Sequence, residues 1–474
     1  MSPSPASRSR LTLIGAALGF VVVVVDVSVV NVALDAFRAD FSTNVAGLEW
    51  VVNAYTLIFA ALLLTTGTLG DRFGARKVFV AGFVLFTAAS VACGLAPTLM
   101  TLVMARLVQG AGAALLIPNS LSLVQQAFPV EATRHRAVGW WSAAGGSALA
   151  AGPVIGGFLV AHFGWRSIFL INLPIGLIGL AITLRYAPRS PVNARRSLDL
   201  PGQGTAIIAL AALATALIEA GHLGWTNPTI IIALSVAVIA TVAFIAIEAR
   251  TTEPMLPLTL FQSRAFTIAS ISGAFLNFAY YGLIFVFSLY FQWQQKFSPQ
   301  ETGLAFLPMT IVLMIANIAS GLLITRLGAR RLMVLGQMLA ASGYLLLLGA
   351  VTTGSYALLI VPMLMAAGGL ALVVPTITNM TLSAVEPSRA GLASGVLNTA
   401  RQVGGMLGVA VCGYLVRDIS EHAFMDGMLL SLALAVILFL SGALLSLLWL
   451  DRAASKDMPH GTKQEANADR SCPA

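Results

Sequence analysis

The chain has 474 residues, of which 58% are hydrophobic and only 10% charged, and its formal net charge is +8. A soluble globular protein carries charge on about a quarter of its residues, so this composition excludes an ordinary soluble domain and requires lipid around most of the chain. The positive charge does not indicate a nucleic-acid partner, because it is concentrated in short loops between apolar runs, where membrane topology explains it.

Apolar runs of about twenty residues recur along the chain, which is the length a helix needs to cross about 30 Å of hydrocarbon. The predicted fold class is therefore an all-α polytopic membrane protein. The first run is too long for a cleavable signal and is expected to remain as a span. The fourteen runs lie near residues 11–34, 49–69, 78–95, 98–124, 138–160, 166–186, 202–221, 229–248, 265–291, 303–325, 331–350, 355–377, 390–414 and 427–450.

Loop charges predict the orientation, since cytoplasmic loops collect Lys and Arg. With residues 1–10 placed in the cytoplasm, the outer loops hold only Arg38, Arg166, Lys296 and Arg417, and the other loop cations are inside. Removing one span would invert every later loop and destroy this asymmetry. An even number of spans with both termini cytoplasmic is predicted.

The first span contains Asp26 within the run VVVVVDVSVV. A carboxylate at membrane depth is costly unless it is paired or protonated. Helix rise places Asp26 in the outer half of the membrane, and Arg106 of the fourth span at a similar depth. The two residues are predicted to form a proton-coupling pair; a static structural ion pair is the alternative.

The end of the second span reads GTLGDRFGARK, from Gly67 to Lys77. Its charges fall in a short cytoplasmic connection, where a carboxylate can pair with a basic group or a helix N-terminus of the neighbouring half. The segment is predicted to be a conformational latch, with a plain basic turn as the alternative. The latch residues are Gly67, Gly70, Asp71, Arg72, Gly74 and Arg76.

The fifth span contains the small-residue run AGPVIGG. Small residues at spacings of four allow close helix packing, and a proline inside a helix removes one backbone hydrogen bond and kinks it. From the residues alone, ordinary helix packing is the favoured interpretation over a pivot. The residues concerned are Gly152, Pro153, Gly156 and Gly157.

The latch sequence recurs 254 residues later as GLLITRLGARR, from Gly321 to Arg331. A parallel repeat of two six-helix halves is a common plan of secondary transporters, with substrate bound between the halves. The halves are predicted at 11–186 and 265–450. A linker at 187–264 carries two extra transmembrane helices, and 451–474 forms a disordered cytoplasmic tail.

Further polar residues lie inside the spans and either line a substrate cavity or hydrogen-bond neighbouring helices. They are Asn31, Asn53, Asn277, Tyr280, Tyr281, Arg401 and Gln402. Glu219 lies near the outer end of the seventh span, where an interfacial carboxylate costs little. The scattered Cys and His residues suggest neither a disulfide framework nor a metal site.

These motifs together resemble the major facilitator superfamily, and within it the fourteen-span drug:proton antiporters of the EmrB/QacA type. The resemblance covers nearly the whole chain and rests on GTLGDRFGARK, ARLVQGAGAA, AGPVIGG, DVSVVNVAL, WRSIFLINLPIG, EPMLPLTLF, LYFQWQQKFSPQETGLAFLP and GVLNTARQVGGMLGVA. It implies that Asp26 couples to protons, that Arg106 sets its proton affinity, and that Gly152 and Pro153 belong to an antiporter motif. Asp35, Ser28 and Thr325 depart from the family pattern.

The sequence therefore predicts a monomeric proton-coupled antiporter of a bacterial inner membrane that exports amphipathic drug-like compounds or antibiotics. It needs no cofactor, since the proton gradient drives it, and no ATP-binding loop of the G-x-x-x-x-G-K-[ST] type occurs. Neutral or singly charged substrates are expected. The alternatives are an exporter of one self-made metabolite or siderophore, a membrane receptor without transport and, less favoured, a membrane enzyme.

Overall fold

The computed structural model describes residues 5–190, 192, 198–386, 389–418 and 420–450, and every regular element within them is a helix. The predicted tail at 451–474 lies outside the described residues. The predicted N-terminal segment is described from Pro5, where the first helix already begins. We call the end of the molecule at which this helix begins the inner end and the opposite end the outer end, following the predicted orientation.

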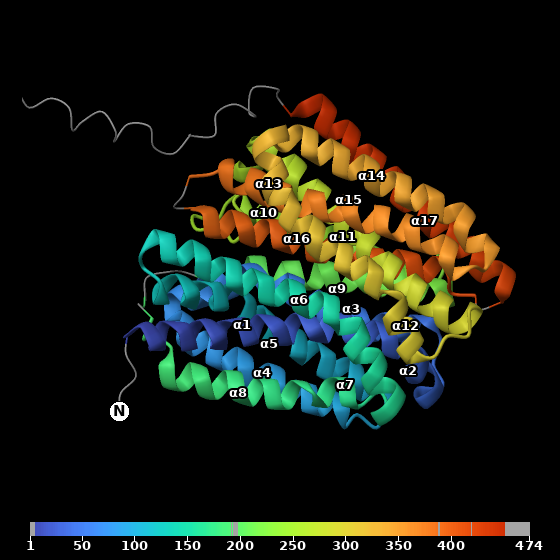
Figure 1. The fold of residues 1–474 in the computed structure, drawn as a ribbon, viewed down its shortest axis with the longest axis horizontal. Coiled ribbons are helices and arrows are strands. Elements are labelled where there is room, and N and C mark those ends of the chain that lie inside the picture. Colours follow the sequence, from blue (N-terminus) through green and yellow to red (C-terminus); the bar gives the residue numbers. More distant parts are fainter. Residues whose placement is uncertain (1–4, 191, 193–197, 387–388, 419, 451–474) are drawn as a thin grey trace, which may run out of the picture.

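The first half of the chain forms a bundle that occupies the lower part of Figure 1, in blue to cyan. Side chains cap its helices at the outer end, where Asn44 accepts from the Gly47 nitrogen at 3.1 Å and Thr98 from the Thr101 nitrogen at 3.2 Å. Its elements are α1 (Pro5–Val30), η1 (Asn31–Ala33), α2 (Leu34–Phe41), α3 (Val45–Phe73), α4 (Ala75–Gly94), α5 (Leu99–Ala127), α6 (Glu131–Phe163), α7 (Ser167–Leu170) and α8 (Asn172–Tyr186).

The second half forms the upper bundle of Figure 1, in yellow to red. A capping box starts α12, in which Ser298 and Glu301 satisfy each other's backbone nitrogens. The elements of this half are η2 (Leu258–Gln262), α11 (Arg264–Leu289), η3 (Tyr290–Gln294), α12 (Pro299–Ala305), α13 (Leu307–Leu327), α14 (Ala329–Ala350), η4 (Val351–Thr353), α15 (Tyr356–Ser383), α16 (Ala390–Leu415) and α17 (Glu421–Trp449).

The predicted linker contains the two extra helices, α9 (Leu200–Leu223) and α10 (Pro228–Glu248). In Figure 1, α9 lies between the two bundles, and it contacts α3 of the first half and α16 of the second. Helix α10 packs on α9 and leaves Ile232, Val238 and Ile239 exposed, as expected of a helix whose outer surface meets lipid. The inserted pair therefore covers the α3/α16 seam between the halves.

In the described residues, 13 helical stretches are long and apolar enough to cross a membrane. Helix α16 is not among them, although its 26 residues suffice in length, because Asn398, Arg401 and Gln402 lower its hydropathy. Each predicted run corresponds to a helix, with ends shifted by up to seven residues. The sixth and tenth runs are each divided into two helices in the structure.

The internal repeat is visible in the backbone at the inner end. Gly74 and Gly328 hold equivalent places in the α3/α4 and α13/α14 turns, with φ of +93° and +76°. Only glycine adopts such a φ without strain, so each one-residue turn requires it. Arg76 and Arg330 each donate to a carbonyl near the inner end of the last helix of their own half, Leu184 and Leu447 respectively.

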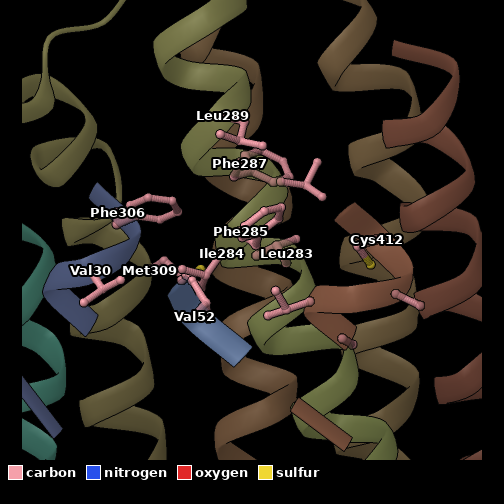
Figure 2. Packing of buried hydrophobic residues seen from close by; sticks show 14 of the residues in the cluster. Val30, Val52, Leu283, Ile284, Phe285, Phe287, Leu289, Phe306, Met309 and Cys412 are labelled. Atoms are coloured by element: carbon pink, nitrogen blue, oxygen red, sulfur yellow. The ribbon is translucent and has the colours of Figure 1, made fainter. Parts of the chain in front are cut away.

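Apolar packing and hydrogen bonds, three of them between the segment η1–α2 and η3, close the outer end between the halves. Figure 2 shows Val30 of α1 and Val52 of α3 beside residues of the second half, including Ile284 and Met309, within one buried cluster. The three hydrogen bonds run from the Trp293 indole to Asp35 (2.7 Å), from the Gln292 amide to the Val32 carbonyl (3.2 Å), and from the Asp35 nitrogen to Gln292 Oε1 (3.3 Å).

Candidate functional site

Asp26 of α1 is fully buried and accepts three hydrogen bonds from the first half. Arg106 Nη1 donates to Oδ2 at 2.5 Å, while Gln109 Nε2 and Asn172 Nδ2 donate to Oδ1 at 2.7 and 3.0 Å. Ionic and amide donors on both oxygens stabilise the charged carboxylate inside the bundle. The depth argument from sequence correctly brought Asp26 and Arg106 together.

The Arg106 guanidinium is held on all sides, so it presents one fixed face to Asp26. Its Nε donates to the Val51 carbonyl at 3.1 Å and its Nη1 also donates to Gln109 Oε1 at 2.8 Å. The guanidinium carbon Cζ of Arg106 lies 4.3 Å from the centroid of the Tyr55 ring, which is a cation–π contact. A lysine has no planar fork with which to make these contacts.

A second layer of buried polar groups supports the pair from α4 and α8. Ser90 Oγ accepts from Gln109 and Asn172 at 3.2 and 2.9 Å and donates to the Phe169 carbonyl at 2.8 Å. Cys93 donates to Gln109 Oε1 at 3.5 Å. Because every donor comes from the first half, the network can move with that half as one body.

Gln109, Asn172 and Ser90 were missed as site residues from the sequence. Gln109 follows Arg106 by three residues on one helix face, and Asn172 lies in the quoted segment WRSIFLINLPIG. Those two positions therefore carried a usable signal. Ser90 lies in an apolar run, and nothing in the sequence around it marks it as a site residue.

The predicted antiporter motif packs one face of α6 on α1. At Gly152 a side chain would overlap Ser28, and at Gly156 a Cβ would lie 3.0 Å from the Val29 backbone. Ser28 and Val29 are two and three residues after Asp26 on α1. Small residues on α6 therefore let the helix that carries Asp26 lie close.

The other face of α6 touches the second half. A Cβ on Gly157 would lie 2.5 Å from the Pro299 carbonyl of α12, and the Pro153 carbonyl lies where a side chain on Gly303 would project. Pro153 is inside the helix, as predicted. The motif is thus a contact between the two halves as well as a packing surface.

The predicted latch forms a tight turn in which one glycine is required by its backbone conformation and another by packing. Gly74 is the positive-φ residue described above, and a side chain on Gly70 would overlap Asn119 of α5. At Gly67 a Cβ would meet open space, so close packing against another helix does not require a glycine there in this conformation.

The charged latch residues make contacts within the first half. Arg76 donates to the Leu184 carbonyl of α8, and its backbone nitrogen donates to Ser190 Oγ at 3.1 Å. Arg72 stacks on Phe73 at 5.5 Å. Asp71 is exposed, and the ion pairs found among the described residues do not include it. The structure therefore does not join Asp71 to the second half.

The predicted cavity residues do not form one cluster. Asn31 is buried in η1, and its amide donates to the Val27 carbonyl of its own helical turn at 3.1 Å. Asn53 is buried on α3 with neither side-chain polar atom hydrogen-bonded. Asn277 is buried on α11, and Gln402 is half-buried on α16.

Aromatic groups and one cation do meet where α11 packs on α16. The rings of Tyr280 and Tyr281 are 5.2 Å apart, and Tyr281 lies 2.6 Å from the Cβ position of Gly405. Arg401, near the middle of α16, contacts Gly273 of α11 through its Cγ, and its Nε has no hydrogen-bond partner. Arg401 therefore places a cation where α11 packs on α16.

Two pseudo-symmetric helix bundles, with a buried carboxylate–guanidinium pair in one and glycine contacts between them, define a membrane transport protein. The family model of the Major Facilitator Superfamily matches residues 16–409 and again 269–469. The chain belongs to this superfamily.

The chain is also similar to curated proteins over most of its length. It is 40% identical to the Methylenomycin A resistance protein of Streptomyces coelicolor, with 87% of each chain covered. It is 38% identical to the Multidrug resistance protein Stp of Mycobacterium tuberculosis, which covers 85% of this chain and 75% of that protein. Among solved structures, the D-xylose-proton symporter aligns with a TM-score of 0.70 at 14% identity, over 94% of this chain and 99% of that chain, a likeness of fold.

Proposed function

We propose that the protein is a proton-driven exporter of small amphipathic compounds, antibiotics among them. The observation that carries the proposal is the buried Asp26, whose charge is balanced by Arg106 and whose two oxygens accept three donors. A resistance protein of the same superfamily, similar over 87% of its length, supports export as the direction of transport.

Asp26 acts as the proton carrier because its charged and neutral forms suit different conformations. Its charge is stabilised while Arg106, Gln109 and Asn172 surround it. Protonation from the outside cancels the attraction to Arg106, weakens this network and favours the return of the empty carrier. Proton release inside restores the ion pair and readies the transporter for the next substrate.

The energy available per proton is modest. Moving one elementary charge through a potential of about 100 mV supplies about 2.3 kcal/mol. One proton per cycle therefore supports a useful but finite substrate gradient, and no bound cofactor is needed to drive it.

The topology proposed is the fourteen-span arrangement of the EmrB/QacA type. The 13 apolar stretches plus α16 give this number, and α16 is enclosed by α3, α9, α11 and α17, which explains how it carries polar residues. Both termini are cytoplasmic, the membrane is a bacterial inner membrane and the transporting unit is a monomer. Asp71 serves as a latch in the conformation in which the inner ends approach each other.

The test is uptake of methylenomycin A, and separately of ethidium, into everted membrane vesicles energised by an acidic lumen. The proposal expects accumulation that an uncoupler abolishes and that vesicles without the protein do not show. The proposal is contradicted if vesicles that contain the folded protein accumulate neither compound. The uncoupler control distinguishes gradient-driven export from passive binding.

A further inference from the structure

A second buried carboxylate lies outside the Asp26 network. Glu49 of α3 is 1% exposed, and its Oε2 has no hydrogen-bond partner among the described residues. It lies four residues after the start of α3, about 6 Å below the outer end of that helix. An unpartnered buried carboxylate is costly when it is charged and requires an explanation.

The surroundings of Glu49 come from three helices that belong to different parts of the protein. Its side chain packs on Gly413 of α16, where a Cβ would lie 2.7 Å from Glu49 Cγ and still closer to the carboxyl group. On the inserted helix α9, Glu219 accepts from the Trp50 indole at 2.7 Å. Glu219 lies about 6 Å from the outer end of α9, so the two glutamates share a depth.

The charges that face Glu49 do not neutralise it. From α9, Glu219 is a like charge that interacts with Glu49, and from α16 the Cys412 thiol lies in its surroundings. From α5, Arg106 is committed to Asp26. Beyond the end of α16, Arg417 bonds the Tyr414 carbonyl and stacks on the Tyr414 ring.

These contacts favour a proton as the ligand. Glu49 packs directly on Gly413 of α16, and the described residues contain no group of three or more His, Cys, Asp or Glu side chains that could hold a metal ion. A proton is small enough, and it removes the charge that burial and Glu219 both disfavour.

We propose that Glu49 is a second proton-binding carboxylate, which takes a proton from outside water as the outer ends of α3 and α16 come together and returns it there when they separate. This rests on the proposed function. Helix α3 belongs to the first half and α16 to the second, so opening the outer end separates Glu49 from Gly413 and exposes it to outside water. Closure then requires the proton, and Trp50 holds Glu219 beside the site.

The first experiment observes the proton without transport. Infrared titration of purified wild type is compared with Glu49→Gln and with Glu301→Gln, a control at an exposed glutamate of the same outer end. The proposal expects Glu49→Gln to remove one titrating carboxyl band that Asp26→Asn leaves in place, and Glu301→Gln to remove none of the buried bands. Absence of a protonated Glu49 band at every pH overturns it, as does a band that never titrates.

The second experiment counts protons from the accumulation of ethidium, a permanent cation, in proteoliposomes with the potential clamped at zero. Each coupled proton contributes a factor of about ten per unit of pH gradient, so wild type and Glu49→Gln should both reach about tenfold, because the Glu49 proton returns to the outside. Glu301→Gln matches wild type. Wild-type accumulation of about 100-fold that falls to about tenfold in Glu49→Gln contradicts the return of this proton to the outside but leaves the proposed function intact. Failure of wild type to accumulate any probe refutes the proposed function, while the infrared titration still decides on Glu49.

Discussion

Replacing Asn172 by leucine isolates one donor to the Asp26 carboxylate. The substitution keeps the side-chain size and removes the 3.0 Å hydrogen bond to Oδ1, while Gln109 and Arg106 keep theirs. Ser90 retains its bond to the Phe169 carbonyl, so no buried donor is orphaned by the change.

The size of the effect follows from the charge of the acceptor. A hydrogen bond to a charged group contributes about 1.5–3 kcal/mol, and one pH unit corresponds to about 1.4 kcal/mol. The lost bond stabilises the ionised form more than the neutral form, so its removal favours protonation. The midpoint of the pH dependence of transport should therefore move upward by about one to two units.

The assay is initial ethidium uptake by everted vesicles as a function of external pH, at a constant pH difference. Thr87→Val is the matched control, since Thr87 is a buried polar residue of α4 that packs on Gly176 and does not contact Asp26. Its midpoint should equal that of wild type. An Asn172→Leu protein that folds, transports and keeps the wild-type midpoint refutes the role assigned to the donors around Asp26.

Two further substitutions test the site and the contact between the halves. Arg106→Lys keeps the charge but loses the guanidinium fork, so gradient-driven uptake should fall at least about tenfold and the melting temperature in detergent should drop. Wild-type uptake would show that charge alone suffices. Gly157→Ala places a methyl group 2.5 Å from the Pro299 carbonyl and should disfavour closure of the outer end, whereas Gly146→Ala on the same helix meets open space. Labelling of an introduced outer-end cysteine should rise in Gly157→Ala only, and equal labelling in the two variants would argue against the contact.

The sequence predicted the helices and the Asp26–Arg106 pair because both depend on local rules. Hydrophobic length defines the spans, and helix rise places two charges at one depth. The second-half repeat was likewise visible in the sequence, and the positive φ of Gly74 and Gly328 agrees with it.

The remaining features depend on which helices meet, which a single sequence does not encode locally. Asn172 reaches Asp26 from 146 residues away. Glu49 is the first residue of a predicted run, yet α3 begins at Val45 and Gly413 of α16 packs on the carboxylate. Asp71 differs again, since the partner of a latch depends on the conformation.

The measurement that tests the central claim most directly compares wild type with Asp26→Asn in everted vesicles, using ethidium under an imposed proton gradient. The account predicts that the variant binds ethidium and exchanges it across the membrane at equilibrium but loses gradient-driven accumulation, because asparagine cannot carry the proton. Accumulation by Asp26→Asn equal to that of wild type would contradict the account and leave Asp26 with a structural role.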